Sequence, residues 1–193
     1  MMEKEGIVEQ GNILRILESS KKAIAEKDVF LLKELSNQTV HSASVYQDAD
    51  SVAVAVLVYA LSKIFERSKY ATYREWPYFN KAVINGIDNS IKCLKENDVE
   101  GFRKSIAGIR TSVNRLSGHF RGYIEDVFRR ASINKASRIY EHGISMEQTS
   151  LLLGITAFEL AEYAGKTGIA DVDLSITLDV KTRIKDALEF FEK

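Results

Sequence analysis

Proline and cysteine are almost missing from this sequence, since Pro77 and Cys93 are the only representatives among 193 residues. Because proline breaks the interior of a helix, its scarcity permits long uninterrupted helices. A single cysteine excludes an internal disulfide bond. No base that would activate a catalytic thiol is apparent near Cys93, so we expect this side chain to serve as a small apolar residue of the core.

The sequence also lacks a hydrophobic run long enough to cross a membrane. The most apolar stretch extends from Val52 to Leu61, whereas a transmembrane helix needs about 20 apolar residues. The first ten residues, MMEKEGIVEQ, are polar and lack the apolar segment of a secretory signal. The sequence therefore predicts a cytoplasmic protein without membrane contact.

Apolar residues recur at helical spacing along most of the chain, which predicts an all-α fold. We expect helices over 12–27, from 28 to about 35, over 51–67 and over 78–95. The segment 36–50 is polar and is predicted to be a helix end followed by a connector. Residues 68–77 are predicted to form a loop ordered by aromatic packing. Alternating valines make a strand the alternative for 51–67, although its alanines and leucines favour a buried helix.

Two segments of the sequence resemble each other. They are KAIAEKDVFLLK at 22–33 and KCLKENDVEGFR at 92–103. Two related helical hairpins would produce such an internal repeat, and a chance match over a dozen residues is the alternative.

Apolar residues between 102 and 127 are separated alternately by four and three residues. They are Phe102, Ile106, Ile109, Val113, Leu116, Phe120, Tyr123 and Val127. This heptad spacing keeps one face of a helix against its neighbours, and Gly118 is an expected kink. The seam is predicted to belong to the bundle of the chain itself. Its alternative role is to join two copies of the chain as a homo-oligomer.

Charge is balanced over the whole chain but is unevenly distributed. Residues 101–140 contain nine basic and two acidic residues, whereas residues 141–193 contain five basic and ten acidic ones. Basic residues that recur every few positions along a helix are typical of a helix face exposed to solvent. The scarcity of acid in the basic segment also favours a surface for a polyanion or an acidic partner.

Residues 135–169 are divided by glycines in a pattern typical of a helix-turn-helix. Ser145 is predicted to cap one short helix and Thr156 the next, because each has Gln or Glu three residues later. Ser150 provides a small side chain where the second helix crosses the first, and Gly154 provides the tight turn. The side chains of Leu160 and Tyr163 are then expected to face inward.

The same segment resembles the helix-turn-helix of a family of small prokaryotic proteins that are uncharacterised or antitoxin-like. The matching positions are Tyr140, Gly143, Ile144, Ser145, Leu153, Gly154, Thr156, Glu159, Gly168 and Ile169. Thr149 and Ser150 stand where the family usually has two alanines. The resemblance implies a regulatory protein, and it covers only the segment 135–169.

Two domains are expected, a helical bundle over 1–130 and a region over 131–193 that contains the helix-turn-helix and a C-terminal helix. The alternating residues near 173–178 predict one short strand. We expect a regulatory protein that is not an enzyme and needs no cofactor.

The leading interpretation is a DNA-binding transcription regulator, because helix-turn-helix motifs usually bind nucleic acid. The alternative is a module that docks on another protein. DNA-binding transcription regulators usually read bases with Arg, Lys, Asn or Gln, which the second helix lacks on its outward side. A protein partner would instead use outward Phe158 as its anchor. The candidate binding residues for either partner are Thr156, Ala157, Phe158, Glu162, Lys166, Arg110, Arg121, Arg129, Arg130 and Arg138.

A metal-dependent helical enzyme is a further alternative, resting on His41, Asp48 and Asp50. His41 and Asp48 are seven residues apart and would share a face of one helix. The simpler interpretation is that Asp48 or Asp50 caps the helix that follows, and we expect no metal site.

Overall fold

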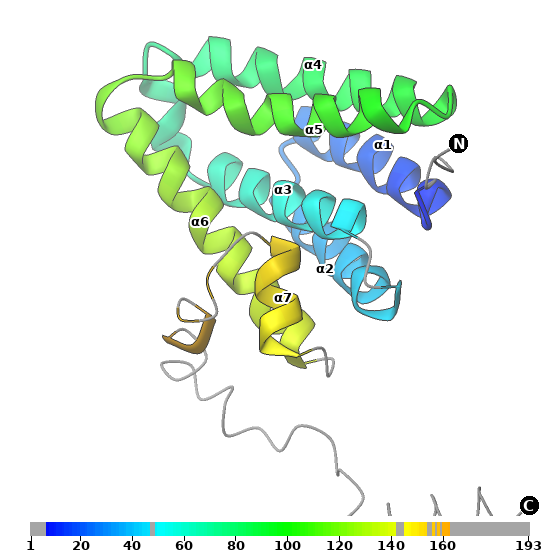
Figure 1. Ribbon diagram of the computed structural model, residues 1–193. Helices are drawn as coiled ribbons and strands as arrows, with labels where there is room; N and C mark the ends of the chain where they lie inside the picture. Colours follow the sequence, from blue (N-terminus) through cyan, green and yellow to red (C-terminus); the bar gives the residue numbers. More distant parts are fainter. Residues whose placement is uncertain are drawn as a thin grey trace, which may run out of the picture.

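The computed structural model describes residues 7–46, 49–141, 145–153, 156, 158 and 160–162. Every regular element in these ranges is helical, which confirms the all-α prediction (Figure 1). The α-helices are α1 (Gln10–Glu26), α2 (Val29–Tyr46), α3 (Ala49–Glu66), α4 (Trp76–Lys95), α5 (Val99–Ser112), α6 (Gly118–Glu141) and α7 (Met146–Leu153). Short 3-10 turns occupy Ser68–Thr72 and Val113–Arg115. Within the described ranges, no helix is both long enough and apolar enough to span a bilayer.

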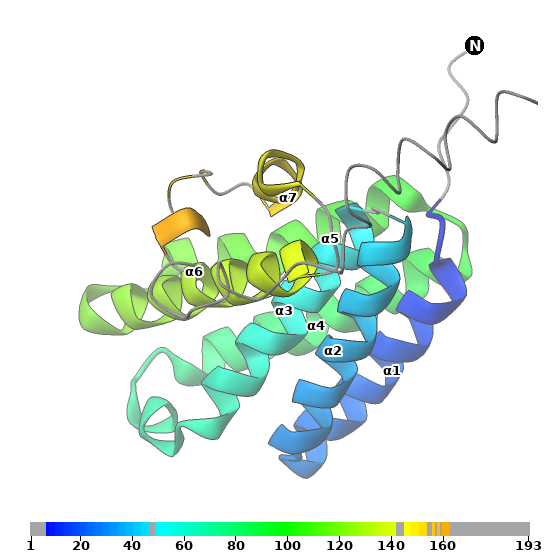
Figure 2. The ribbon, with the colours of Figure 1, turned by 90° about the horizontal axis from the view of Figure 1, so that it is seen from below.

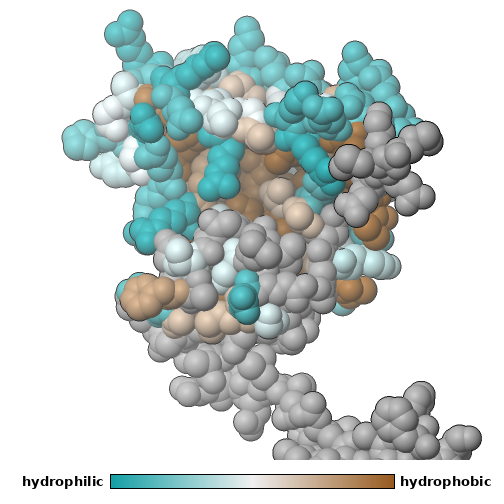
Figure 3. Space-filling model, viewed as in Figure 1, coloured by the Kyte–Doolittle hydropathy of each residue, from teal (hydrophilic) through white to brown (hydrophobic). Residues whose placement is uncertain are grey.

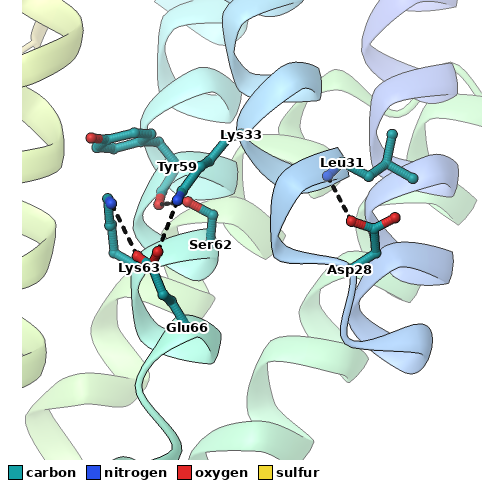
Figure 4. A network of polar contacts seen from close by, with 7 residues as sticks. All are labelled: Asp28, Leu31, Lys33, Tyr59, Ser62, Lys63 and Glu66. Atoms are coloured by element: carbon teal, nitrogen blue, oxygen red, sulfur yellow. Dashed lines mark hydrogen bonds and ion pairs between the residues drawn. The ribbon is translucent and has the colours of Figure 1, made fainter.

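The turn from α1 to α2 has the same geometry as the turn from α4 to α5. Lys27 and Asn97 both adopt the left-handed conformation, with φ of 57° and 56°. The next residue in each turn, Asp28 or Asp98, accepts a hydrogen bond from the backbone N–H three residues later at 2.9 Å, which for Asp28 is the N–H of Leu31 (Figure 4). Lys27 and Asn97 are matched when 22–33 is aligned with 92–103, so the repeated sequence segments correspond to repeated structure.

The repeat extends over three helices. In the same alignment α2 and α5 begin at equivalent residues, Val29 and Val99, and α3 and α6 begin at nearly equivalent ones, Ala49 and Gly118. Each outer helix packs against its own counterpart, α1 against α4 and α3 against α6 (Figures 1 and 2). We refer to α1–α3 and α4–α6 as the two triplets.

The counterpart helices run antiparallel. The Gln10 side chain near the start of α1 donates a hydrogen bond of 2.8 Å to the Leu94 carbonyl near the end of α4. Further along α1, Lys21 forms an ion pair of 2.6 Å with Asp88. α3 also runs antiparallel to α6, because Val52 near the start of α3 lies in the same apolar cluster as Ile139 near the end of α6. The triplets are therefore related as by an approximate two-fold axis.

An aromatic cluster joins the segment between α3 and α4 to the start of α6. Phe120 is 1% exposed, and its ring lies 4.8 Å from that of Tyr73 and 6.0 Å from that of Tyr70. The ring of Trp76 lies 5.4 Å from that of Phe65 and 6.5 Å from that of Phe120. The prediction that aromatic residues order this segment is confirmed, although part of it forms a 3-10 turn.

The prediction of a connector over 36–50 is wrong for residues 36–46, because α2 continues to Tyr46. Two polar side chains of this segment, Ser36 and Thr39, are buried and bonded to backbone carbonyls. The Ser36 hydroxyl donates to the Ala55 carbonyl of α3 at 2.7 Å, and the Thr39 hydroxyl donates to the Leu35 carbonyl at 2.8 Å. Tertiary contact with α3 therefore extends a helix that sequence composition alone does not favour.

The heptad seam over 102–127 is not one kinked helix. α5 ends at Ser112, a 3-10 turn follows, and α6 begins at Gly118, whose φ of +54° suits glycine. Of the seam residues, Phe102, Ile109, Val113, Leu116, Phe120 and Val127 are buried. Because the chain itself covers them, this seam offers no continuous face through which a second copy could form a homo-oligomer.

The described part of the 131–193 region packs on the helices of both triplets. Val40 of α2, Val52 of α3 and Ile139 of α6 form a second apolar cluster with fully buried Leu160. The expected domain boundary after residue 130 falls inside α6. The expected strand near 173–178 and the C-terminal helix lie outside the described residues.

Candidate functional site

The described residues after α7 present an apolar and acidic face to solvent. Thr156 is non-helical, and its carbonyl accepts a hydrogen bond of 3.2 Å from the N–H of Leu160 as a helix begins. Leu160 is fully buried, whereas Phe158 is 76% exposed. Thr156, Ala161 and Glu162 are also exposed. We call Thr156, Phe158, Ala161 and Glu162 the 156–162 face.

This arrangement agrees with several expectations for the helix-turn-helix, but its turn lies outside the described residues. α7 begins directly after Ser145, and Ser150 is buried with its hydroxyl bonded to the Met146 carbonyl at 2.7 Å. The inward position predicted for Leu160 is confirmed. The other predicted positions, Ala157, Gly154, Glu159, Tyr163 and Lys166, belong to the part of the chain that the structure does not describe.

The five candidate arginines are exposed but do not form one cluster. Arg110 lies near the end of α5, whereas Arg121, Arg129, Arg130 and Arg138 lie along α6. Two of the α6 arginines form ion pairs on their own helix, Arg121 with Glu125 at 2.7 Å and Arg130 with Asp126 at 2.9 Å. Exposed pairs of this kind are weak. The α6 segment contains five basic and three acidic residues and is therefore net basic.

A groove between α3, α5 and α6 is lined mostly by apolar side chains, and sequence reasoning missed it. Its volume is about 290 Å³. Figure 3 shows apolar side chains gathered in a hollow on this face, with hydrophilic side chains around it. The lining residues are Asp50, Val52, Ala53, Val56, Leu57, Phe102, Arg103, Ile106, Ala107, Arg110, Phe128 and Ser132. We call this the α3/α5/α6 groove.

An ion pair closes one side of the groove. The guanidinium of Arg103 donates to both carboxylate oxygens of Asp50, with Nε to Oδ1 at 3.0 Å and Nη2 to Oδ2 at 2.8 Å. The Asp50 side chain is only 9% exposed, whereas that of Arg103 is 54% exposed. Because these residues are far apart in the sequence and on different helices, no local spacing indicates that they meet.

The groove exists because α5 does not pack along α6, whereas the equivalent helices of the first triplet, α2 and α3, pack along each other. α5 packs on α4 instead and has little contact with α6. When the two triplets are aligned, the small or medium side chains Ser36, Val40 and Ala43 correspond to Ile106, Arg110 and Val113. A charged arginine in place of a buried valine prevents the equivalent close approach, because burying it would need a partner.

The first triplet uses the position equivalent to Arg103 for a different contact. Lys33 of α2 forms an ion pair with Glu66 of α3 at 2.9 Å, and Lys63 joins it at 3.0 Å (Figure 4). Hydrogen bonds from Lys33 and then Lys63 lower the pKa of Glu66, and the Glu66 carboxylate raises the pKa of Lys33. This surface network is a structural tie between helices.

Lys135 is a buried cation that sequence reasoning also missed. Its side chain lies between α2, α3 and α6 and is 1% exposed. Its ammonium donates to Oδ1 of Asn37 at 3.0 Å and lies 4.2 Å from the ring centre of Tyr59. Burial, and then the charge of Arg138, lower the pKa of Lys135 to about 8. The sequence signal that could have indicated its burial is its position four residues after Ala131, which places both residues on the same side of α6.

The metal-site alternative finds no ligand cluster in the described residues. His41 is exposed on α2, and the Asp50 carboxylate is occupied by Arg103. Asp48 lies outside the described residues. No group of three His, Cys, Asp or Glu side chains suited to a metal ion occurs in the ranges that the structure describes.

Comparison of the chain with protein-family models, with curated proteins and with solved structures finds no match.

Proposed function

We propose that this chain is a regulatory protein without catalytic activity that binds a protein partner through the 156–162 face. The observation that carries this proposal is the 76% exposure of Phe158 beside a fully buried Leu160. An aromatic ring held in solvent on an anchored helix can fill an apolar pocket of a partner. The adjacent Glu162 favours a partner with a cation at the rim of that pocket. The antitoxin-like resemblance of the segment supports the same class of function.

Replacing Phe158 with alanine is expected to reduce partner recovery strongly without destabilising the chain. Wild type, Phe158→Ala and Phe30→Ala would be used as baits in a lysate of the source organism, with recovered proteins quantified by mass spectrometry. Phe30 is a matched control, because it is 73% exposed on α2. A hot-spot aromatic contributes about 2 kcal/mol or more, so recovery should fall by roughly thirtyfold for Phe158→Ala alone. An identical set of partners for all three baits would contradict the proposal.

Duplex DNA is the second candidate partner, and the basic surface of α6 favours it. Arg121, Arg129, Arg130 and Arg138 are all exposed on this helix. The 156–162 face contributes no base-reading side chain among its described residues, so this contact would be with phosphates.

The DNA hypothesis predicts affinity that falls steeply with salt and depends on the α6 arginines. Fluorescence anisotropy with a labelled duplex would be measured across salt concentrations. Each arginine that contacts a phosphate contributes about 0.9 to the log–log slope, so Arg129→Gln and Arg138→Gln should each reduce it by about that amount. Arg74→Gln, an exposed arginine outside α6, should not. Absence of binding at low salt would remove DNA from consideration.

A further inference from the structure

The size and lining of the α3/α5/α6 groove suit a small molecule with an apolar chain. Its volume of about 290 Å³ lies at the lower edge of ligand pockets, which span about 300–1,000 Å³. A partner helix with its side chains is about 10–12 Å across and would need more space. Phe102 and Phe128 are buried at the groove, and Leu57 completes its apolar floor. The polar lining residues are few, namely Asp50, Arg103, Arg110 and Ser132.

The charge at the groove is positive. Its charged lining residues are Asp50, Arg103 and Arg110. The Asp50 carboxylate neutralises Arg103 through three hydrogen bonds. Arg110 is exposed and has no ion-pair partner among the described residues. Arg103 and Arg110 are seven residues apart on α5, which places both on the same side of that helix. A ligand held here therefore meets one uncompensated cation beside an apolar surface.

We propose that the α3/α5/α6 groove binds a free medium-chain fatty carboxylate, with its chain against Phe102 and Phe128 and its carboxylate on Arg110. Arginine is suited to this role because its planar guanidinium donates two parallel hydrogen bonds to a carboxylate. The ordered pair of Arg103 with Asp50 fixes the wall next to the ligand. The position in the first triplet that corresponds to Arg110 is Val40, which is buried against α3, so no equivalent site is present there.

Isothermal titration of the full chain with decanoate, below the concentration at which it forms micelles, tests the class of ligand. Decanol has the same chain without the charge, and decyltrimethylammonium has the opposite charge. We expect saturable binding of decanoate and at least tenfold weaker binding of the other two probes. Binding of all three with similar affinity, or no binding of decanoate, overturns the proposal.

Two substitutions locate the ligand, each with a matched control. Arg110→Gln should weaken decanoate binding by about tenfold, the value of one charge-assisted contact, while Arg74→Gln should leave it unchanged. Ala53→Trp would place a large ring in the groove from an exposed position on α3 and should abolish binding. Ala25→Trp makes the same change on the exposed surface of α1 and should not. Equal effects of a variant and its control would overturn the assigned site.

Loss of this site is distinguishable from failure of the proposed function. Phe158 is not among the residues that line the groove. Phe158→Ala should therefore bind decanoate as wild type does, whereas Arg110→Gln should still recover the same protein partner. Loss of decanoate binding in Phe158→Ala would contradict the placement of the ligand in the groove.

Discussion

Phe120→Ala should lower the free energy of unfolding by about 3–5 kcal/mol, the range for removing a large buried aromatic side chain. The Phe120 ring is 1% exposed and contacts rings both of the segment between α3 and α4 and of α4 itself. These include Tyr73 in the segment before α4 and Phe79 within α4. Removing the ring leaves a cavity whose walls belong to separate elements and cannot all close together.

Urea denaturation followed by circular dichroism would measure this loss. Tyr123→Ala is a suitable control, because Tyr123 lies three residues later on α6 and is 41% exposed. We expect it to cost about 1 kcal/mol or less. If Phe120→Ala cost no more than Tyr123→Ala, the aromatic cluster would not hold the segment before α4 to the start of α6 as its geometry indicates.

Lys135→Met should increase the free energy of unfolding at pH 7, because it removes a buried positive charge. The pKa of Lys135 is about 8 in the folded chain against 10.5 for an ordinary lysine. This difference corresponds to a penalty of about 3 kcal/mol. Methionine has a similar length and can occupy the same space. Loss of the contacts with Asn37 and Tyr59 offsets part of the gain, so we expect about 1–3 kcal/mol.

The effect of Lys135→Met should depend on pH in a defined direction. Below about pH 8 the lysine is protonated in both states, and the full penalty is present. Between about pH 8 and 10.5 the unfolded chain holds a proton that the folded chain lacks, so the stability of the wild type rises with pH. The advantage of the variant should therefore shrink over this interval.

Denaturation of wild type and Lys135→Met at several pH values would measure the difference. Subtracting the two curves removes the titration of the other lysines. Lys81→Met, at an exposed position on α4, should change stability by about 0.5 kcal/mol or less at every pH. A Lys135→Met variant that is less stable at pH 7, or a difference that is constant with pH, would contradict this account.

The helical class could be predicted from the sequence because the relevant signals are local. Helical spacing of apolar residues and a single proline suffice for the all-α fold, and Asp28 is a recognisable cap before an apolar segment. The similarity of 22–33 to 92–103 was visible as well. Its meaning became clear only from the shared conformation of Lys27 and Asn97.

Features that depend on contacts between distant helices were not predictable in this way. The heptad spacing continues through residues 113–117, where the chain turns, because residues of a turn can enter the same core as the helices beside it. The continuation of α2 to Tyr46 depends on hydrogen bonds and packing with α3. The pair of Asp50 with Arg103, and the groove beside it, require the relative placement of three helices.

The antiparallel pairing of α1 with α4 and of α3 with α6 is the arrangement of an isologous dimer, in which each copy offers the same surface to the other. Here a covalent connection holds the halves together, so their association does not cost the freedom of two separate molecules. Because the two halves belong to one chain, their sequences can differ from each other. A homodimer of one such half would have two grooves or none. This single chain instead has a groove beside Arg110 in one half, whereas the equivalent position in the other half is filled by buried Val40.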